Sequence, residues 1–217
     1  MHHVQITDNG GRIVATNSSV DIHDTAVGGN DLPYGAALEI AFNSSDRSFN
    51  TVTLNDNRIA GNLLAPGAVP LQITNDRPST SVVFDIQRNV FGGQDGPDFT
   101  LNANGRVQGN VTCNTFAGGA NGISVHSNQP QTFSTFLNIR DNAVEQHTPP
   151  LDPFFRQNHI GRGAASEIEL NMDGNWWGDP TGPYVPDRHP EGRGDAVGAN
   201  ISFANWRTER PACAPSP

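Results

Sequence analysis

Five charged residues stand at outward positions of a phrase that recurs along the chain, and their types could support chemistry on an acidic sugar. Removing a proton next to a sugar carboxylate needs a base and a cation that neutralises the acid. Arginine can act in these roles, and aspartates can hold Ca²⁺ as the cation. The candidate catalytic residues are Asp85, Arg88, Arg140, Asp141 and Asp173.

The phrase that carries these residues alternates apolar and polar side chains, then reaches an Asn, an apolar residue and glycine. Its anchors lie 32, 32, 25, 28 and 33 residues apart, and a period in this range is typical of a stacked solenoid. Stacked Asn side chains can pair their amides from coil to coil, which satisfies the polar groups of a turn. We therefore expect a structural role for the anchors, which are Thr25 in the first copy and then Asn57, Asn89, Asn114, Asn142 and Asn175.

A second series of alternating segments lies between the copies of the phrase. Each coil therefore has at least two short strands, joined by polar loops rich in Gly and Pro. A β-sandwich of many short strands is the alternative, but it does not predict one eight-position template six times. The sequence thus predicts an all-β chain, a right-handed parallel β-helix of about six coils with a C-terminal cap. The second series comprises 4–9, 38–43, 71–76, 99–104 and 123–128, and we expect 154–158 to continue it.

The polar residues of the phrase fall on the outward face of its strand, and copies in neighbouring coils stand about 4.8 Å apart. We expect Arg140 beside Asp141 and Asp173, and Asp85 near Arg88. A flat face with hydrogen-bonding side chains at regular spacing suits an extended polysaccharide. A solvated ladder of structural ion pairs is the alternative, and the sequence favours it over an active site.

The last copy of the phrase runs into a distinct end segment. It contains Asn-Trp-Trp-Gly at 175–178, Gly-Pro at 182–183, Gly-Asp-Ala-Val at 194–197 and a strand over 201–206. These roughly 30 residues resemble the C-terminal end of right-handed parallel β-helix proteins of the pectate-lyase-like superfamily, with Asn205 where that family usually has Pro. We expect coils over 1–178 and a capping tail over 179–217. Because an open solenoid end exposes its core, large apolar groups suit the cap: Trp176, Trp177, Phe203 and Trp206.

The resemblance also bears on activity. Lyases of the family commonly use Lys or Arg as the base, and this chain has no lysine, so Arg88 or Arg140 would have to serve. Hydrolysis would instead need two carboxylates at a defined separation. The chain lacks the Asp-x-Asp, Gly-His-Gly and Arg-x-Lys signatures of polygalacturonases. The carboxylates available for hydrolysis are Asp21, Asp24, Asp56 and Asp85.

The first residues predict an unusual start. Val4 already belongs to the second series, so the chain begins in the middle of a coil without an amphipathic capping helix. One explanation is that the chain is a piece of a longer β-helix. The other is that its open end pairs with another molecule and builds end-to-end assemblies or a filament.

The composition of the chain limits the classes of partner that it can bind. The net charge is −9 and all 13 basic residues are Arg, which makes nucleic acid an improbable partner. No stretch approaches the length of a membrane span. The two cysteines, Cys113 and Cys213, could form a disulfide that ties the tail along the side of the helix, or could be two free thiols.

Several other signals are weaker. Arg193-Gly194-Asp195 spells an adhesion triplet, but the end segment already expects Gly and Asp there. The loop over 145–163 departs most from the repeat and is the best place for a groove wall. The histidines are dispersed without metal-ligand spacing: His23, His126, His147, His159 and His189.

Together these features predict a secreted or surface-displayed domain with a structural, adhesive or polysaccharide-binding role. The alternatives are a polysaccharide lyase or hydrolase that acts on acidic glycans, and a self-assembling filament subunit. No cofactor is expected, apart from Ca²⁺ if the lyase interpretation holds.

Overall fold

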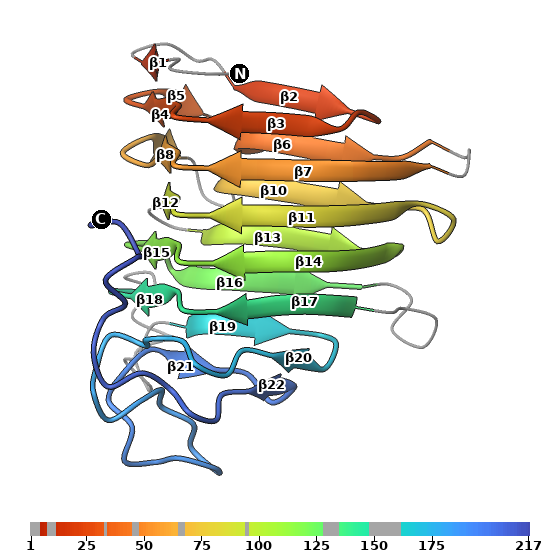
Figure 1. The fold of residues 1–217 in the computed structure, drawn as a ribbon. Helices are drawn as coiled ribbons and strands as arrows, with labels where there is room; N and C mark the ends of the chain where they lie inside the picture. Colours follow the sequence, from red (N-terminus) through yellow and green to blue (C-terminus); the bar gives the residue numbers. More distant parts are fainter. Residues whose placement is uncertain are drawn as a thin grey trace.

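The computed structural model is an all-β solenoid of about six turns, with parallel sheets that run along the stack and no helix in the part of the chain that it describes. Strands of successive coils lie directly above one another (Figure 1). Among those residues, none forms a helix long and apolar enough to cross a membrane. The structure describes residues 5–7, 12–32, 34–44, 48–64, 68–93, 96–127, 135–147 and 162–217.

Sheet A is built from the strand that precedes each anchor. Its neighbours pair in parallel and in register, so Asp21, Thr53, Asp85, Asn110 and Asn138 form one column. The alternation of buried and more exposed residues along each strand puts such polar columns on the outside. The strands are β3 (Val20–His23), β7 (Phe49–Asn55), β11 (Ser81–Gln87), β14 (Arg106–Thr112) and β17 (Thr135–Arg140).

Sheet B is a third, short strand per coil that directly follows the anchor. Residues 5–7 pair with residues 26–28 and so belong to this sheet, whereas the sequence placed 4–9 in the second series. The assignment was wrong because an apolar residue between two polar ones fits either strand. The strands are β1 (Gln5–Thr7), β4 (Ala26–Gly28), β8 (Arg58–Ile59), β12 (Val90–Phe91), β15 (Thr115–Ala117) and β18 (Ala143–Glu145).

Sheet C corresponds to the second series. Segment 154–158, expected to continue this series, lies outside the described residues, and the strand that pairs with β16 is β19. Pairing of β19 with β21 carries the sheet past the expected domain boundary at residue 178. The strands are β2 (Ile13–Thr16), β6 (Ala36–Phe42), β10 (Val69–Asn75), β13 (Pro97–Ala103), β16 (Asn121–His126), β19 (Arg162–Ser166) and β21 (Ala196–Val197).

Two further parallel pairs complete the fold, β5 (Asp31–Leu32) with β9 (Leu63–Leu64) and β20 (Leu170–Asn171) with β22 (Ile201–Ser202). The core runs through the middle of the stack, where each sheet contributes its inward residues. The eighth position of the phrase supplies one such residue per coil, on sheet B in the first five copies and beyond its last strand in the sixth. These side chains are all nearly inaccessible to solvent: Val27, Ile59, Phe91, Phe116, Val144 and Trp177.

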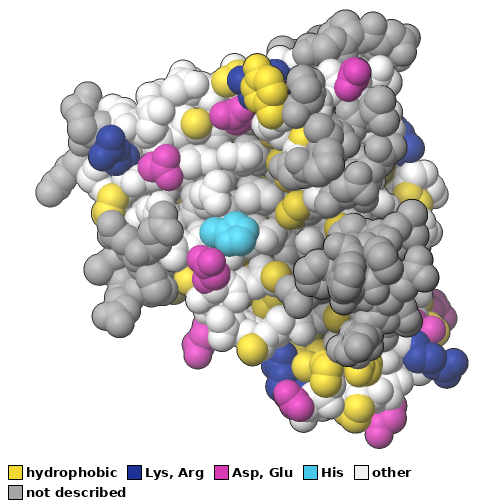
Figure 2. Space-filling view, turned by 180° about the vertical axis from the view of Figure 1, so that it is seen from behind, with side chains coloured by type: hydrophobic (Ala, Val, Ile, Leu, Met, Phe, Trp, Pro, Cys, Tyr) yellow, Lys and Arg dark blue, Asp and Glu magenta, His cyan; other side chains and the backbone are white. Residues whose placement is uncertain are grey.

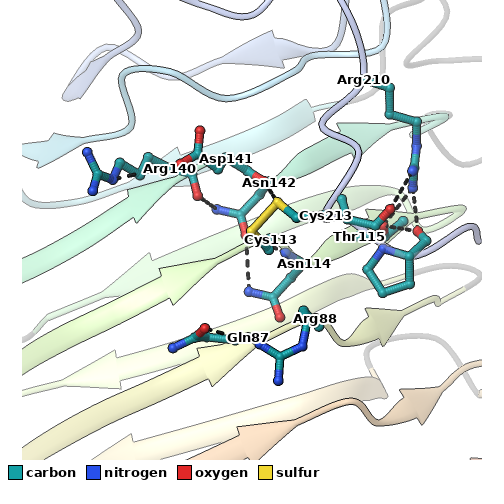
Figure 3. Close-up of a disulfide and its surroundings, with 12 residues drawn as sticks. Gln87, Arg88, Cys113, Asn114, Thr115, Arg140, Asp141, Asn142, Arg210 and Cys213 are labelled. Carbon is teal, nitrogen blue, oxygen red and sulfur yellow. Dashed lines mark hydrogen bonds and ion pairs between the residues drawn. A yellow bond between two sulfur atoms is a disulfide. The ribbon is translucent and has the colours of Figure 1, made fainter.

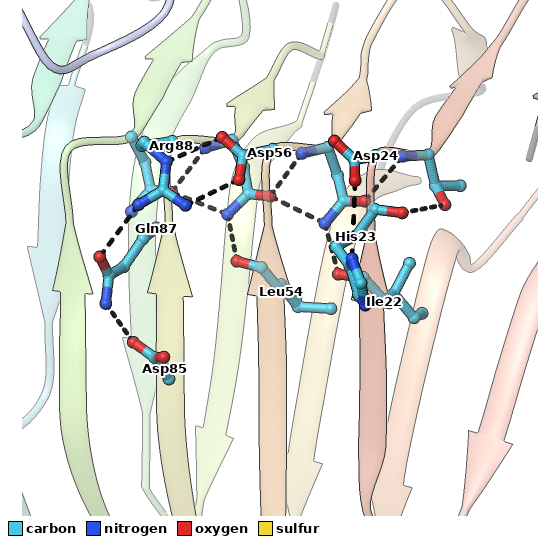
Figure 4. A network of polar contacts seen from close by, with 12 residues as sticks. Ile22, His23, Asp24, Leu54, Asp56, Asp85, Gln87 and Arg88 are labelled. Carbon is cyan, nitrogen blue, oxygen red and sulfur yellow. Dashed lines mark hydrogen bonds and ion pairs between the residues drawn. The ribbon is translucent and has the colours of Figure 1, made fainter. Parts of the chain in front are cut away.

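A ladder of buried amides holds the turn between sheets A and B (Figure 4). The Asn89 side chain donates from Nδ2 to Asn114 Oδ1 at 2.9 Å and to the Leu54 carbonyl at 2.7 Å. Asn114 Oδ1 also accepts the Asn89 backbone N–H at 3.0 Å. Equivalent bonds link Asn57 to Asn89, Asn114 to Asn142 and Asn142 to Asn175. One side chain per coil thus satisfies backbone groups that the turn leaves unpaired.

The residue before each anchor has a left-handed backbone, which produces the bend. Its φ lies between 52° and 76° in all six copies, although only the last of them is a glycine. The side chain therefore projects outward from the corner, one position away from the buried amide. The residues are Asp24, Asp56, Arg88, Cys113, Asp141 and Gly174.

The end segment uses its aromatic residues in two ways. Trp177 is fully buried in the main core, and Phe203 and Trp206 pack half-buried against that core, as a cap requires. Trp176 does not enter the main core. It points outward and forms a separate cluster with Ala143 and Ala214. Adjacent residues on an extended strand face opposite sides, so Trp176 and Trp177 could not both enter the core.

The last residues run back along the outside of sheet B as a tail (207–217), seen in dark blue in Figure 1. A disulfide joins Cys113 to Cys213 across 100 residues of sequence, with 5.2 Å between the Cα atoms (Figure 3). Arg210 donates to Glu145 Oε1 at 2.8 Å and to Thr115 Oγ1 at 2.7 Å. The tail thereby covers the outer side of the later strands of sheet B.

Candidate functional site

A groove lies at the C-terminal end of the outer face of sheet A. It has a volume of about 600 Å³ and is bordered by strand β17, the turn around Gly174 and the start of the tail. Strand β17 presents alternate residues to it, because every second side chain of a strand points the same way. The polar and aromatic residues of its lining are Phe136, Asn138, Arg140, Asp141, Asn171, Asp173, Asn205 and Arg207.

Phe136 is the most conspicuous residue of the groove, since it is 68% exposed whereas most aromatic side chains in the described ranges are buried. Gln108 of the neighbouring strand stands in register with it. Beside them, the Asn138 amide donates to Asn110 Oδ1 at 3.0 Å. An exposed ring next to fixed amides can offer both a stacking surface and hydrogen bonds to a ligand.

The charged residues of the groove lie close to one another. Arg140 Nε is 3.9 Å from Asp141 Oδ2, and the Arg140 side chain is 61% exposed. Arg207 of the tail donates to the same Asp141 carboxylate. Asp173 accepts a hydrogen bond of 2.5 Å from the Ser202 hydroxyl. The charges of these two arginines and two aspartates cancel within the groove.

The five residues predicted to form one site are divided between two places. Arg140, Asp141 and Asp173 line the groove together, as expected. Asp85 and Arg88 belong to β11 and its turn, which are separated from β17 by β14. Two strand spacings correspond to about 10 Å, so the two groups cannot act on one sugar carboxylate together.

Arg88 is committed to an ion pair one coil away. Its guanidinium binds both oxygens of Asp56, at 2.8 and 2.7 Å, while Gln87 stands between it and Asp85 (Figure 4). The hydrogen bonds from Arg88 hold the pKa of Asp56 below its usual range. Since Arg88 in turn has a raised pKa, it is a poor candidate for a base.

A buried cluster that the sequence did not reveal joins three distant segments. His147 lies between two carboxylates, with Nε2 2.7 Å from Asp98 Oδ2 and Nδ1 2.5 Å from Asp195 Oδ2. All three are buried. Burial opposes protonation of His147, but the hydrogen bonds to Asp195 and Asp98 outweigh it and raise the pKa to about 9. Burial also raises the pKa of both aspartates.

Glycines make room for this cluster. A Cβ atom on Gly119 would lie 2.7 Å from Asp98 Oδ1, and one on Gly122 would lie 3.0 Å from His147 Cε1. Gly119 and Gly122 lie far from Asp98 and His147 in the sequence, so no local sequence pattern indicated the cluster. Asp195 also belongs to the Arg-Gly-Asp triplet, and its burial leaves no accessible carboxylate for adhesion.

Within the described ranges, no group of three or more His, Cys, Asp or Glu residues is arranged to hold a metal ion, so the Ca²⁺ considered for a lyase gains no support. The fold itself defines the class of the molecule, a parallel β-helix. Comparisons with protein-family models, curated proteins and solved structures found no match to the chain.

Proposed function

We propose that this protein binds an extended polysaccharide along the outer face of sheet A, with one end of the sugar chain in the groove beside Phe136. The observation that carries the proposal is the exposed Phe136 ring in a groove lined by amides and balanced charges. Sugar rings have apolar faces that stack on aromatic side chains, and their hydroxyls bond to amides and carboxylates.

The outer columns of sheet A extend this surface along the stack. Thr53, Asp85, Asn110 and Asn138 repeat in register on successive strands, at a spacing of about 4.8 Å. A second groove of about 830 Å³ adjoins the first, shares Leu137 and Asn171 with it, and includes Trp206 in its lining. Both features support a ligand longer than a single sugar.

The proposal favours a neutral glycan over an acidic one. The arginines that could bind a uronate already contact carboxylates: Arg88 contacts Asp56, and Arg140 and Arg207 contact Asp141. The chain carries a net charge of −9, which repels polyanions at low ionic strength. The resemblance of the end segment to the pectate-lyase-like superfamily agrees with a carbohydrate ligand but leaves its charge open.

We also propose a secreted or surface location. A disulfide between distant parts of the chain persists in oxidising compartments and is rare in the cytosol.

Affinity electrophoresis through gels that contain single neutral or acidic polysaccharides tests the function. We expect a neutral polysaccharide to retard the protein, and Phe136→Ala to weaken retardation at least tenfold. Tyr34→Ala is the matched control, because Tyr34 is 70% exposed but lies between β5 and β6, outside sheet A and the groove. No retardation by any polysaccharide, or equal loss in both variants, would contradict the proposal.

The same samples separate binding from lyase activity. A lyase produces an unsaturated sugar that absorbs ultraviolet light, so an absorbance increase with a uronate polymer that disappears in Arg140→Ala would replace the binding proposal. We expect no such increase.

A further inference from the structure

Three side chains on the outer face of sheet C form a serine–histidine–carboxylate relay. Ser124 and His126 stand two residues apart on β16 and so share one face, with Ser124 Oγ 2.9 Å from His126 Nε2. Glu167, which follows β19, places Oε1 3.4 Å from His126 Nδ1. In the view of this face, a histidine lies beside an acidic side chain among uncharged groups (Figure 2).

The two ring nitrogens of His126 face the groups that nucleophilic catalysis requires. A carboxylate opposite Nδ1 fixes the proton there, so Nε2 can accept the serine proton. Glu167 is held in place by the Ser127 backbone N–H, which donates to its Oε2 at 2.8 Å. That bond, together with His126, keeps the pKa of Glu167 below its usual range, so the carboxylate is charged at neutral pH.

The neighbouring strand offers a donor for a developing negative charge. Asn102 of β13 pairs in register with His126, and its Nδ2 donates to Thr74 Oγ1 at 3.3 Å. An amide nitrogen carries two hydrogens, so the second can point to an oxyanion beside Ser124. Thr100 stands in register with Ser124 and adds a hydroxyl to the same surface.

We propose that Ser124, His126 and Glu167 form an esterase site that removes short acyl groups from a polar alcohol. Ser124 Oγ attacks the ester carbonyl while His126 Nε2 takes the hydroxyl proton, which then passes to the leaving alcohol. Water attacks the acyl-serine, returns a proton to Oγ through His126, and releases the carboxylic acid. The overall reaction consumes one ester and one water and yields one acid and one alcohol.

Local burial and polarity set the substrate class. Ser124 is only 7% exposed, so a small acyl group such as acetyl can reach Oγ and a long chain cannot. The surroundings are uncharged hydrogen-bonding groups such as Gln72, Thr74 and Asn102, which suit a hydroxylated alcohol. The proposal does not depend on glycan binding at sheet A, which is a different face of the stack.

Hydrolysis of p-nitrophenyl acetate and labelling by a fluorophosphonate test this site. We expect the reagent to modify Ser124, as located by peptide mass spectrometry, and Ser124→Ala to lose both labelling and at least tenfold in kcat/KM. Ser202→Ala is the matched control. The Ser202 hydroxyl also bonds to a carboxylate, that of Asp173, but neither residue hydrogen-bonds to a histidine in the part of the chain that the structure describes.

The other variants assign the roles. His126→Asn should lower kcat/KM as much as Ser124→Ala does, because it removes the base for the serine proton. Glu167→Gln, which can still accept the Ser127 N–H, should lower kcat more than KM. Hydrolysis that persists in Ser124→Ala but falls in His126→Asn would indicate attack by imidazole alone and overturn the proposal. Labelling of another serine would overturn it too. Glycan retardation is expected to be unchanged in Ser124→Ala, so the two proposals can fail separately.

Discussion

Two columns of polar residues run along the same corner of the solenoid, one position apart in sequence, and they follow opposite rules. The buried column repeats one residue, as in Asn89 and Asn114, and each amide makes the same bonds in each coil. The exposed column changes its residue and its partner from coil to coil, from the Arg88–Asp56 ion pair to the Cys113–Cys213 disulfide.

The difference follows from desolvation. A buried polar atom without a partner costs about 1 to 3 kcal/mol, so the same residue, Asn, satisfies the turn at five of the six anchors, and Thr25 stands at the first. An exposed polar atom can bond to water, so its identity is free to vary. The repeat therefore indicates how the chain stacks, and the departures from it indicate where the coils are tied to other segments.

The largest expected effect is at the buried column. Asn114→Ala removes the acceptor of the Asn89 backbone N–H and amide, and also the donor to the Ile86 carbonyl. We expect a loss of about 3 to 5 kcal/mol in the free energy of unfolding, measured by denaturant titration. Asn138→Ala, which removes an amide that bonds to Asn110 on the outer face, is the control and should cost less than about 1 kcal/mol. Equal losses in the two variants would contradict the distinction between buried and exposed polar groups.

The second largest expected effect is the loss of the Cys113–Cys213 disulfide of the exposed column. The double variant Cys113→Ser/Cys213→Ser should lower the free energy of unfolding by about 2 to 4 kcal/mol, because the bond closes a long loop in the unfolded chain. The freed tail should also become cleavable by trypsin after Arg207, since the bond after Arg210 precedes Pro211 and resists the enzyme. Reduced wild-type protein should behave in the same way. A tail that stays protected without the disulfide would show that the Arg210 hydrogen bonds suffice.

The buried His147 cluster extends the comparison to pH. Because its folded pKa of about 9 exceeds the ordinary value near 6.5, the folded state binds the proton more tightly. Its contribution to stability, up to about 3 kcal/mol, is complete below pH of about 6.5 and is lost as the pH rises through about 9. Thermal unfolding of wild type and His147→Gln between these pH values should converge at the alkaline end. A constant difference would mean that His147 does not titrate in this range.

The smallest effect belongs to the exposed ion pair. Arg88→Ala should change the free energy of unfolding by less than about 1 kcal/mol, and high salt should reduce the difference further, because exposed pairs are screened. Urea titration at low and high salt measures it. A loss of unfolding free energy as large as that of Asn114→Ala would mean that exposure does not decide how much a polar contact at this corner contributes.

Much of the fold was predictable because the solenoid repeats its physical constraints. The alternation around residues such as Leu54 and Ile86, and the spacing of the asparagines, indicated parallel coils and inward faces. The third strand per coil was not separated from the turn, since β8 and β12 have only two residues each. Such short strands carry too few positions to show a period.

The candidate site was predictable only in part. Arg140, Asp141 and Asp173 come from adjacent coils, so the repeat register brought them together. Arg207 and Phe136 were not anticipated, because Arg207 reaches the groove through the folded-back tail and Phe136 has no matching aromatic in the repeat. The His147 cluster joins residues nearly 50 positions apart along paths that the period does not describe.

The folded-back tail gives the solenoid different mechanical behaviour at its two ends. A force on the first coils acts on each coil in turn, since each contacts only its neighbours, so they should peel away singly. A force on the last residues reaches Cys113 through the disulfide and bypasses the coils that lie between β14 and β22. These later coils are thus shielded from tension and should unfold only after the force has been transmitted to the middle of the stack.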